Sequence, residues 1–187
     1  MQTHQHSQGP AKLLVDFVGF IPKGKALDIA MGEGRNALYL ASQGFDVEGV
    51  DKDEEAVKAC LTSAKARGLK LIVQTADLEK YQIYQAHYDL ILCFYYLQRS
   101  LLPQIRLALR PGGMVIYETF LIDNHLQFGH PKHREYCFEH NELLNSFRDF
   151  RVLFYHEGMI EGRTVAAQIV AQKPSIKLKC NQRAQRR

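Results

Sequence analysis

The sequence predicts an α/β fold with a seven-stranded, mostly parallel sheet, helices on both faces and a terminal antiparallel hairpin. The first observation is a strand, glycine turn, helix and second strand over residues 26–51, written ALDIAMGEGRNALYLASQGFDVEGVD. The second is that strand and helix patterns go on alternating until Phe120, as is typical of parallel sheets with crossover helices. The third is a closing pair of strand patterns joined through Gly158 and Gly162, which can form a hairpin.

The strands are predicted from apolar runs and alternating patterns that end at turn residues. The run from Tyr88 to Phe94 is nearly all apolar after Asp89, which indicates a central strand covered on both faces. The sequence Arg110-Pro111-Gly112-Gly113 is interpreted as a turn that feeds the fifth strand. The predicted strands are 25–29, 46–51, 70–75, 88–94, 114–120, 150–156 and 164–171.

The helices are predicted from apolar residues at i, i+3 and i+4 spacing and from residues typical of helix ends. Ala37, Leu40 and Ala41 have this spacing after the glycine turn, and Gly44 ends that helix. Asp53 is a good N-cap for the following helix. The predicted helices are 12–20, 35–43, 54–67, 100–109 and 139–147, and residues 1–10 are expected to be disordered.

Length and composition favour one globular domain. The chain has 187 residues, of which 46% are hydrophobic, and this is enough for a real core. No apolar run approaches the roughly 18 residues of a membrane span, and the polar start MQTHQHSQGP lacks a signal pattern. We therefore expect a cytoplasmic protein that does not bind membranes, as a monomer or homodimer. The four cysteines are widely spaced without a CxxC pair, which predicts free thiols.

The formal charge of +4 is unevenly distributed. Residues 173–187 hold six basic residues and no acidic one, so the preceding residues have 18 basic against 20 acidic side chains. A basic tail can contact RNA phosphates. A short polar terminus is more often solvated and mobile, and this second interpretation is favoured.

The glycine turn predicts a nucleotide-binding loop. Gly32 and Gly34 allow the backbone to turn tightly and to approach a ligand without a Cβ in the way. Asp51 ends the second strand, where an acid can accept hydrogen bonds from a ribose. The alternative is a tight strand-to-helix turn that binds nothing.

Two ligands fit the predicted loop. A dinucleotide fits because residues 32–37, GEGRNA, match the looser GxGxx(G/A) pattern. S-adenosylmethionine fits because its ammonium and sulfonium groups would be attracted by Asp28 and Glu33, whereas a pyrophosphate would be repelled. Charge complementarity therefore favours S-adenosylmethionine.

Three separated motifs then resemble the class I S-adenosylmethionine-dependent methyltransferases, and most closely the branch named for tellurite-resistance methyltransferases. They are residues 32–51, Ala76-Asp77-Leu78 and residues 109–113, LRPGG, in this order. The resemblance spans about Lys25 to Lys173 and implies a Rossmann-like class I methyltransferase fold with S-adenosyl-L-methionine as cofactor. It divides the chain into an N-terminal extension and helix (1–24), a methyltransferase domain (25–172) and a basic tail (173–187).

The resemblance also implies where the cofactor binds. Ala30 stands where the family usually has the first glycine of its loop, and Ala is small enough to be tolerated there. Asp77 would accept a hydrogen bond from the adenine amino group, although an Asp in this place can also be a helix cap. The predicted cofactor-binding residues are Asp28, Ala30, Gly32, Glu33, Gly34, Arg35, Asn36, Asp51, Lys52, Ala76, Asp77, Leu78, Cys93 and Phe94.

The methyl acceptor is expected at the carboxyl edge of the sheet. Residues 121–137 show little periodicity and are interpreted as a long loop that recognises the acceptor. Within it His125, His133 and Arg134 are the predicted catalytic residues, which would orient an anionic acceptor. The histidine spacing matches no zinc pattern, so no metal is predicted. The aromatic strand end, residues 94–96, could flank a sulfonium, wall the acceptor pocket or belong to the core.

The function predicted is methyl transfer from S-adenosylmethionine to a small, anionic or electron-rich acceptor by in-line displacement. Alignment and desolvation would be the main contributions of the protein. A general base would be needed only if the acceptor atom is protonated at neutral pH. The alternatives are a non-catalytic S-adenosylmethionine-binding or RNA-associated module and a nicotinamide-dependent enzyme.

Overall fold

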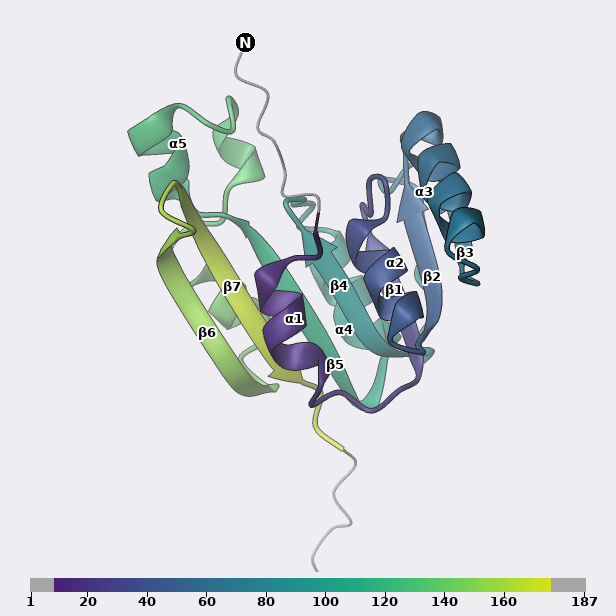
Figure 1. Cartoon of the computed structure of the whole chain (residues 1–187). Helices are drawn as coiled ribbons and strands as arrows, with labels where there is room; N and C mark the ends of the chain where they lie inside the picture. The colour runs from purple at the N-terminus through teal and green to yellow at the C-terminus, as the bar shows by residue number, and fades with distance from the viewer. Residues whose placement is uncertain (1–8, 176–187) are drawn as a thin grey trace, which may run out of the picture.

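A seven-stranded mixed sheet forms the centre of the molecule (Figure 1). The computed structural model describes residues 9–175, so most of residues 1–10 and of the tail 173–187, both expected to be disordered, lie outside the described residues. The strand order is β3-β2-β1-β4-β5-β7-β6, in which all neighbours are parallel except the pairs β5–β7 and β6–β7. The strands are β1 Lys25–Ile29, β2 Asp46–Asp51, β3 Ile72–Thr75, β4 Tyr88–Phe94, β5 Leu109–Phe120, β6 Arg151–Ile160 and β7 Thr164–Gln172. The predicted fold class, including the terminal antiparallel hairpin, is confirmed.

Helices cover both faces of the sheet. Helices α1 and α2 pack on one face, where Leu90 and Leu92 of β4 point, and α4 and α6 pack on the other face, where Ile91 points (Figure 1). This alternation explains why β4 reads as one continuous apolar run. The helices are α1 Lys12–Val18, α2 Arg35–Ser42, α3 Glu54–Ala66, α4 Leu101–Ala108, α5 Ile122–Phe128 and α6 Glu142–Ser146, with a short 3₁₀ helix η1 at Arg134–Tyr136.

The order of the strands fixes where a ligand can enter. The chain moves outward from β1 to β2 and β3, and then returns to the other side of β1 to form β4. The crossover helices after β1 and β4 therefore lie on opposite faces, which leaves a crevice outside the carboxyl ends of these two strands. The glycine turn and the aromatic strand end predicted from the sequence both lie at this edge.

Two segments differ from the sequence expectation. The predicted turn 110–113 is part of β5, which runs from Leu109 with a register shift against β4 between Tyr88 and Leu90. A side chain at Gly113 would crowd the main chain, because a Cβ would lie 3.0 Å from the carbonyl oxygens of Tyr88 and Arg110. The glycines thus permit an irregular strand rather than a turn before it.

The segment 121–137 is the second difference, because it is not a continuous loop. It contains α5, which ends at Gly129 with a left-handed φ of 63°, and the 3₁₀ helix η1. Its two ends are joined to the sheet region by backbone hydrogen bonds from Ile122 N to Phe138 O and from Phe138 N to Phe120 O, both 2.9 Å. In the part of the chain that the structure describes, no helix is long and apolar enough to cross a membrane.

Candidate active site

The glycine turn adopts left-handed backbone at three positions. Ala30, Gly32 and Gly34 have φ values of 54°, 57° and 78°. A Cβ on Gly32 would meet no protein atom within 4 Å, so this backbone faces open space, whereas a Cβ on Gly34 would overlap the Cys60 Sγ. Gly32 is therefore available for close approach by a ligand, and Gly34 is required for packing of α2 against α3.

Asp28 is buried beside this turn. Its side chain is 1% exposed, and its Oδ2 has no hydrogen-bond partner among the described residues. Burial raises the pKa of Asp28 to about 7, although a hydrogen bond from the Ala37 backbone and the charge of Arg35 oppose the rise. An unpartnered buried carboxylate oxygen is costly, and a cationic ligand group would compensate it.

The acid at the end of β2 is fixed by backbone donors. Asp51 Oδ2 accepts from Gly32 N at 2.7 Å, and Asp51 Oδ1 accepts from Asp53 N at 2.9 Å. Because a carboxylate has about four acceptor sites, Asp51 keeps capacity for ribose hydroxyls. We call Asp28, residues 30–34 and Asp51 together the glycine-turn site.

The third predicted acid has a local partner. Asp77 Oδ1 accepts from Glu79 N at 3.0 Å, and this bond closes a turn at residues 78–80 rather than capping a helix, because no helix lies between β3 and β4. The side chain remains exposed, so the hydrogen bond does not block contact with a ligand.

Arg35 and Asn36 contact the segment before α1. The Arg35 Nη1 donates to Gly9 O at 3.3 Å, and the buried Asn36 Oδ1 accepts from Ala11 N at 2.8 Å. Asn36 was expected at the cofactor, but in this structure it anchors the start of α1. Glu33 and Lys52 are exposed, and Lys52 lines the cavity described below.

The remaining predicted cofactor residues lie at the ends of β3 and β4. Ala76 is partly buried, and its N donates to Asp51 O at 2.8 Å, so it is attached to the acid of β2. Leu78, Cys93 and Phe94 are buried in the core. Burial raises the pKa of the Cys93 thiol to about 12, so this cysteine is a neutral apolar side chain rather than a nucleophile.

A cavity of about 630 Å³ opens beside the glycine turn. Tyr95 and Phe120 line it, and their ring centroids lie 5.3 Å apart. Tyr95 follows β4 and has a left-handed φ of 54°. A tyrosine in this conformation is uncommon, and such strain is often found at functional sites. We call this space the aromatic cavity; its lining residues are Ala11, Lys12, Arg35, Lys52, Tyr95, Tyr96, Leu97, Glu118, Phe120, His130, Pro131, Tyr136, Glu161 and Thr164.

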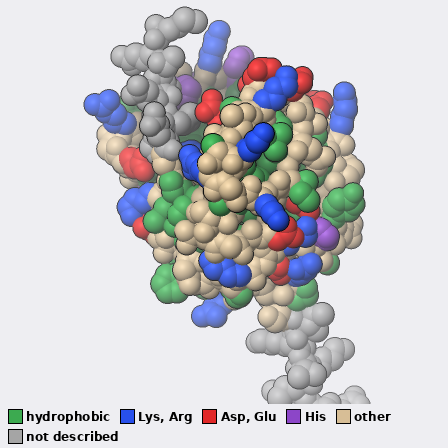
Figure 2. Space-filling view, turned by 45° about the vertical axis from the view of Figure 1, so that its right-hand side comes forward, with side chains coloured by type: hydrophobic (Ala, Val, Ile, Leu, Met, Phe, Trp, Pro, Cys, Tyr) green, Lys and Arg blue, Asp and Glu red, His purple; other side chains and the backbone are tan. Residues whose placement is uncertain are grey.

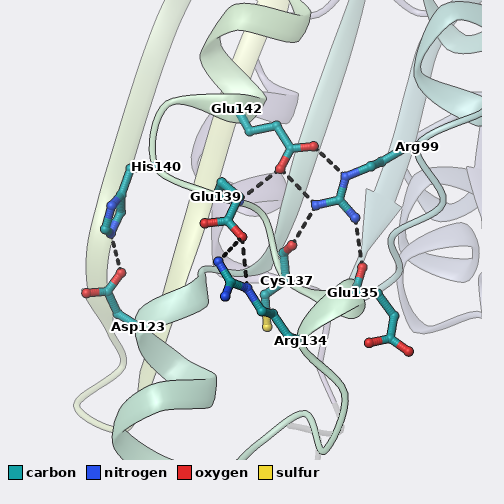
Figure 3. A network of polar contacts seen from close by, with 8 residues as sticks. All are labelled: Arg99, Asp123, Arg134, Glu135, Cys137, Glu139, His140 and Glu142. Carbon is teal, nitrogen blue, oxygen red and sulfur yellow. Dashed lines mark hydrogen bonds and ion pairs between the residues drawn. The ribbon is translucent and has the colours of Figure 1, made fainter.

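The predicted catalytic residues do not line the aromatic cavity. His125 Nδ1 lies 2.8 Å from Pro131 O, and His133 Nδ1 lies 3.6 Å from a Glu135 carboxylate oxygen. Arg134 binds the Glu139 carboxylate at 2.8 Å (Figure 3). The same segment instead brings His130, Pro131 and Tyr136 into the lining, and the sequence reasoning did not select these residues.

A polar network holds this segment against α4 and α6. Arg99 donates to both carboxylate oxygens of Glu142, at 2.6 and 2.9 Å, and to the carbonyl oxygens of Glu135 and Cys137, both at 2.9 Å (Figure 3). Arginine has a planar fork of donors, which suits this kind of cross-linking. His125, His133 and Arg134 contact residues of the cavity lining rather than the cavity itself: His125 lies against Pro131, the ring centroid of His133 is 5.9 Å from that of Tyr136, and Arg134 belongs to the same 3₁₀ helix as Tyr136.

Clusters of metal-binding side chains and patches of basic side chains would indicate other ligands. Among residues 9–175, no group of three or more His, Cys, Asp or Glu side chains could hold a metal ion. On the face drawn in Figure 2, lysine and arginine side chains are dispersed among acidic and apolar ones rather than gathered in one patch.

Comparison with known proteins supports the resemblance seen in the motifs. Residues 3–180 match the sequence model of the family described as Tellurite resistance protein TehB. A protein of Haemophilus influenzae named "Probable S-adenosyl-L-methionine-dependent methyltransferase TehB" is 28% identical over 155 residues, which are 79% of this chain and 53% of that protein. "Hemagglutinin 1" of Eikenella corrodens is 29% identical over 171 residues, covering 80% of this chain and 55% of that protein. The chain spans about half the length of these curated relatives.

A solved structure gives the same answer for the fold. The crystal structure of TehB from Haemophilus influenzae superposes with a TM-score of 0.73 at 23% identity, covering 92% of this chain and 63% of that chain. At this identity the likeness concerns the fold, and the site residues must be argued from the geometry above.

Proposed function

Since the chain belongs to the tellurite resistance protein TehB family, we propose that it is an S-adenosylmethionine-dependent methyltransferase that acts on a small, anionic or electron-rich acceptor by in-line methyl transfer. The observation that carries the proposal is the buried, unpartnered Oδ2 of Asp28 beside the open backbone of Gly32. A carboxylate in this position suits a ligand with an ammonium group and disfavours a pyrophosphate.

The glycine-turn site fits the cofactor in its chemistry. Asp28 would bind the ammonium group, Asp51 would accept hydrogen bonds from ribose hydroxyls, and Gly32 would let the ligand approach the main chain. S-adenosylmethionine supplies a methyl group on a sulfonium sulfur, which is already an activated leaving group. No nucleophilic side chain is then required of the protein.

The aromatic cavity is the proposed acceptor site. Tyr95, Phe120 and Tyr136 offer flat apolar walls, and Lys12, Arg35, Lys52 and His130 add cationic or hydrogen-bonding groups. A small aromatic or anionic nucleophile suits this lining. The chain would contribute by excluding water and by holding the acceptor in line with the methyl group.

His125, His133 and Arg134 have an indirect place in this proposal. Because His125 contacts Pro131 and Arg134 holds the 3₁₀ helix that ends at Tyr136, they would orient the acceptor through the cavity wall. The domain 25–172 would contain both sites, with α1 closing the cavity from the N-terminal side.

Calorimetry followed by a turnover assay tests the proposal. We expect S-adenosylmethionine and S-adenosylhomocysteine to bind and NADH not to bind, because the buried carboxylate suits an ammonium group. Release of S-adenosylhomocysteine should then depend on added small thiols, phenols or anions. Binding of NADH alone would indicate a nicotinamide enzyme, and tight cofactor binding without turnover on any acceptor would indicate a non-catalytic module.

A further inference from the structure

We propose that Glu118 is the general base of this site and that the acceptor is a neutral thiol or hydroxyl compound that reaches the enzyme protonated. The inference rests on the proposed function and narrows its acceptor class. Glu118 lies on β5, near the end of the strand, and its side chain lines the aromatic cavity.

The Glu118 carboxylate is buried but reachable. The residue is 5% exposed, and it lines both the aromatic cavity and an adjoining cavity of about 330 Å³ beneath α1. Lys12 and Glu161 line the same two cavities, so Glu118 belongs to the wall that the two spaces share. A group bound in either space can come within reach of the carboxylate.

Neutral donors hold this carboxylate in place. Gln168 stands opposite Glu118 in the β5–β7 register, and its Nε2 donates to Glu118 Oε2 at 2.6 Å. The Tyr95 hydroxyl also donates to the Glu118 carboxylate, while Tyr95 N donates to Glu118 O at 2.8 Å. Tyr95, which has the left-handed backbone, thus binds Glu118 through both its main chain and its side chain.

No cation neutralises Glu118 directly. In the described part of the chain, no lysine, arginine or histidine forms a salt bridge with it. Burial raises the pKa of Glu118, and the charge of Glu161 adds to the rise. The hydrogen bonds from Gln168 and Tyr95 and the more distant charge of Arg35 offset part of it. A glutamine could keep the bond to Gln168 without the cost of a buried charge, so the fold alone does not explain an acid here.

The chemical step follows from this arrangement. Glu118 accepts the proton of the acceptor S–H or O–H group, and the electron pair of the broken bond stays on the acceptor sulfur or oxygen. That electron pair forms the new bond to the methyl carbon, and the pair of the old sulfonium–methyl bond remains on the departing thioether sulfur. Glu118 afterwards releases the proton to water. Two of the four acceptor sites of a carboxylate are used by Gln168 and Tyr95, which leaves capacity for the proton.

The test compares the turnover of two thiols that carry an aromatic ring, with the full-length protein as enzyme. Benzyl mercaptan is protonated at neutral pH, whereas 4-nitrothiophenol is already ionised. We expect Glu118→Gln to lower turnover of benzyl mercaptan by about 100-fold or more, the scale of general-base catalysis, and to leave 4-nitrothiophenol within about threefold. Glu157→Gln is the matched control, because Glu157 on β6 also accepts a hydrogen bond from a tyrosine hydroxyl, that of Tyr155, but lines neither cavity, and the variant should leave both thiols within about threefold.

The pH profile gives a second criterion. Because Glu118 must be ionised to act, wild-type turnover of benzyl mercaptan at saturating S-adenosylmethionine should fall as the pH drops through the raised pKa of Glu118, and Glu118→Gln should lose this acid limb. Saturation removes the separate effect of Asp28 on cofactor affinity. The other ionisable groups that line the two cavities stay unchanged in the variant; they are Lys12, Asp16, Arg35, Lys52, Tyr95, Tyr96, His130, Tyr136, His156 and Glu161.

A readout without turnover completes the test. Carbon-13 NMR of the labelled glutamate carboxyl groups, assigned by the signal that Glu118→Gln removes, should show Glu118 ionised at neutral pH and shifted when benzyl mercaptan is added. An equal fall of turnover on both thiols, no fall on either, or a carboxyl that stays protonated well above neutral pH would overturn the inference. Absence of any methyl transfer by the wild type would instead count against the proposed function.

Discussion

The glycine-turn site and the aromatic cavity lie at the same edge of one sheet, but they are built in opposite ways. The glycine-turn site depends on main-chain conformation within residues 28–51, with left-handed φ values at Ala30, Gly32 and Gly34. The aromatic cavity depends on side chains from α1, β5, α2 and the segments after β4 and α5. Changes in the first should therefore affect folding and cofactor affinity together, whereas changes in the second should affect the acceptor alone.

The largest expected effect is on the fold, at Gly34. Gly34→Ala places a Cβ against Cys60 Sγ and also forces an alanine into a left-handed φ of 78°. The costs of overpacking and of backbone strain therefore add up. We expect the free energy of unfolding to fall by about 4 kcal/mol. Gly32→Ala shares the left-handed φ but meets no atom, and it should cost about 1 kcal/mol in stability. Urea unfolding of both variants measures the difference; equal losses would mean that packing against α3 is not the reason for Gly34.

The second effect is on cofactor affinity, at Asp28. Asp28→Asn removes the charge that the ammonium group would meet, and the affinity for S-adenosylhomocysteine should fall by about 3 kcal/mol, the upper range for a hydrogen bond to a charged group. Methylthioadenosine lacks the amino acid group, so its affinity should change little. Calorimetry with both ligands gives the comparison, and an equal loss for both would place the ammonium group elsewhere.

The raised pKa of Asp28 adds a pH dependence with a defined sign. The folded, ligand-free protein binds this proton more tightly than the unfolded chain, because the pKa rises from 3.8 to about 7. Its contribution to stability is therefore present at acid pH and is lost as the pH rises through about 7. The affinity for S-adenosylhomocysteine should increase over the same range, and Asp28→Asn should remove both trends.

The variant Asp51→Ala tests whether the main chain and the ligand compete for the Asp51 carboxylate. Asp51→Ala removes the acceptor of the Gly32 and Asp53 amides as well as the proposed ribose acceptor. We expect the affinity for S-adenosylhomocysteine to fall by roughly 1.5–3 kcal/mol, and the stability by about 1 kcal/mol. Affinity that stays at the wild-type level in calorimetry would take Asp51 out of the cofactor site.

The same contrast explains what the sequence could predict. The sequence predicts the turn at Gly32 and Gly34 and the acid Asp28 before it, because glycine conformation and the charge at a strand end are local properties that a short pattern records. Asn36 fits that pattern equally well, yet it binds Ala11, a contact that only the folded chain defines. The pattern indicated correctly where the turn lies, but it did not indicate which of its polar residues would anchor α1.

The aromatic cavity was harder to predict because His130, Pro131 and Tyr136 of its lining come from the segment that follows α5, a helix that the sequence pattern does not reveal. Leu126 and Phe128 of α5 are 71% and 52% exposed, so apolar residues do not mark one face of this helix, and its period is hidden. The sequence indicated an acceptor segment at 121–137 and a histidine cluster within it. It could not show that His130, rather than His125 or His133, lines the cavity, because this depends on how the helix ends at Gly129.

The smallest expected effect on the cofactor separates the two regions most directly. Replacing His125, His133 and Arg134 together by Ala should leave the affinity for S-adenosylhomocysteine within about threefold, because none of them contacts the glycine-turn site. Turnover of an identified acceptor should nevertheless fall by about tenfold or more, because the contacts that hold Pro131 and the 3₁₀ helix with Tyr136 are lost.

His130→Ala is the matched comparison for this triple variant, because His130 is the histidine of the same segment that lines the cavity. If the three residues act through the cavity wall, the triple variant should raise KM for the acceptor at least as much as His130→Ala does. If instead the triple variant turns over normally while His130→Ala does not, the segment is rigid without those contacts and His130 alone carries acceptor binding. A collapse of cofactor affinity in the triple variant would show that the two regions are coupled, and the contrast between a main-chain site and a side-chain site would then have to be abandoned.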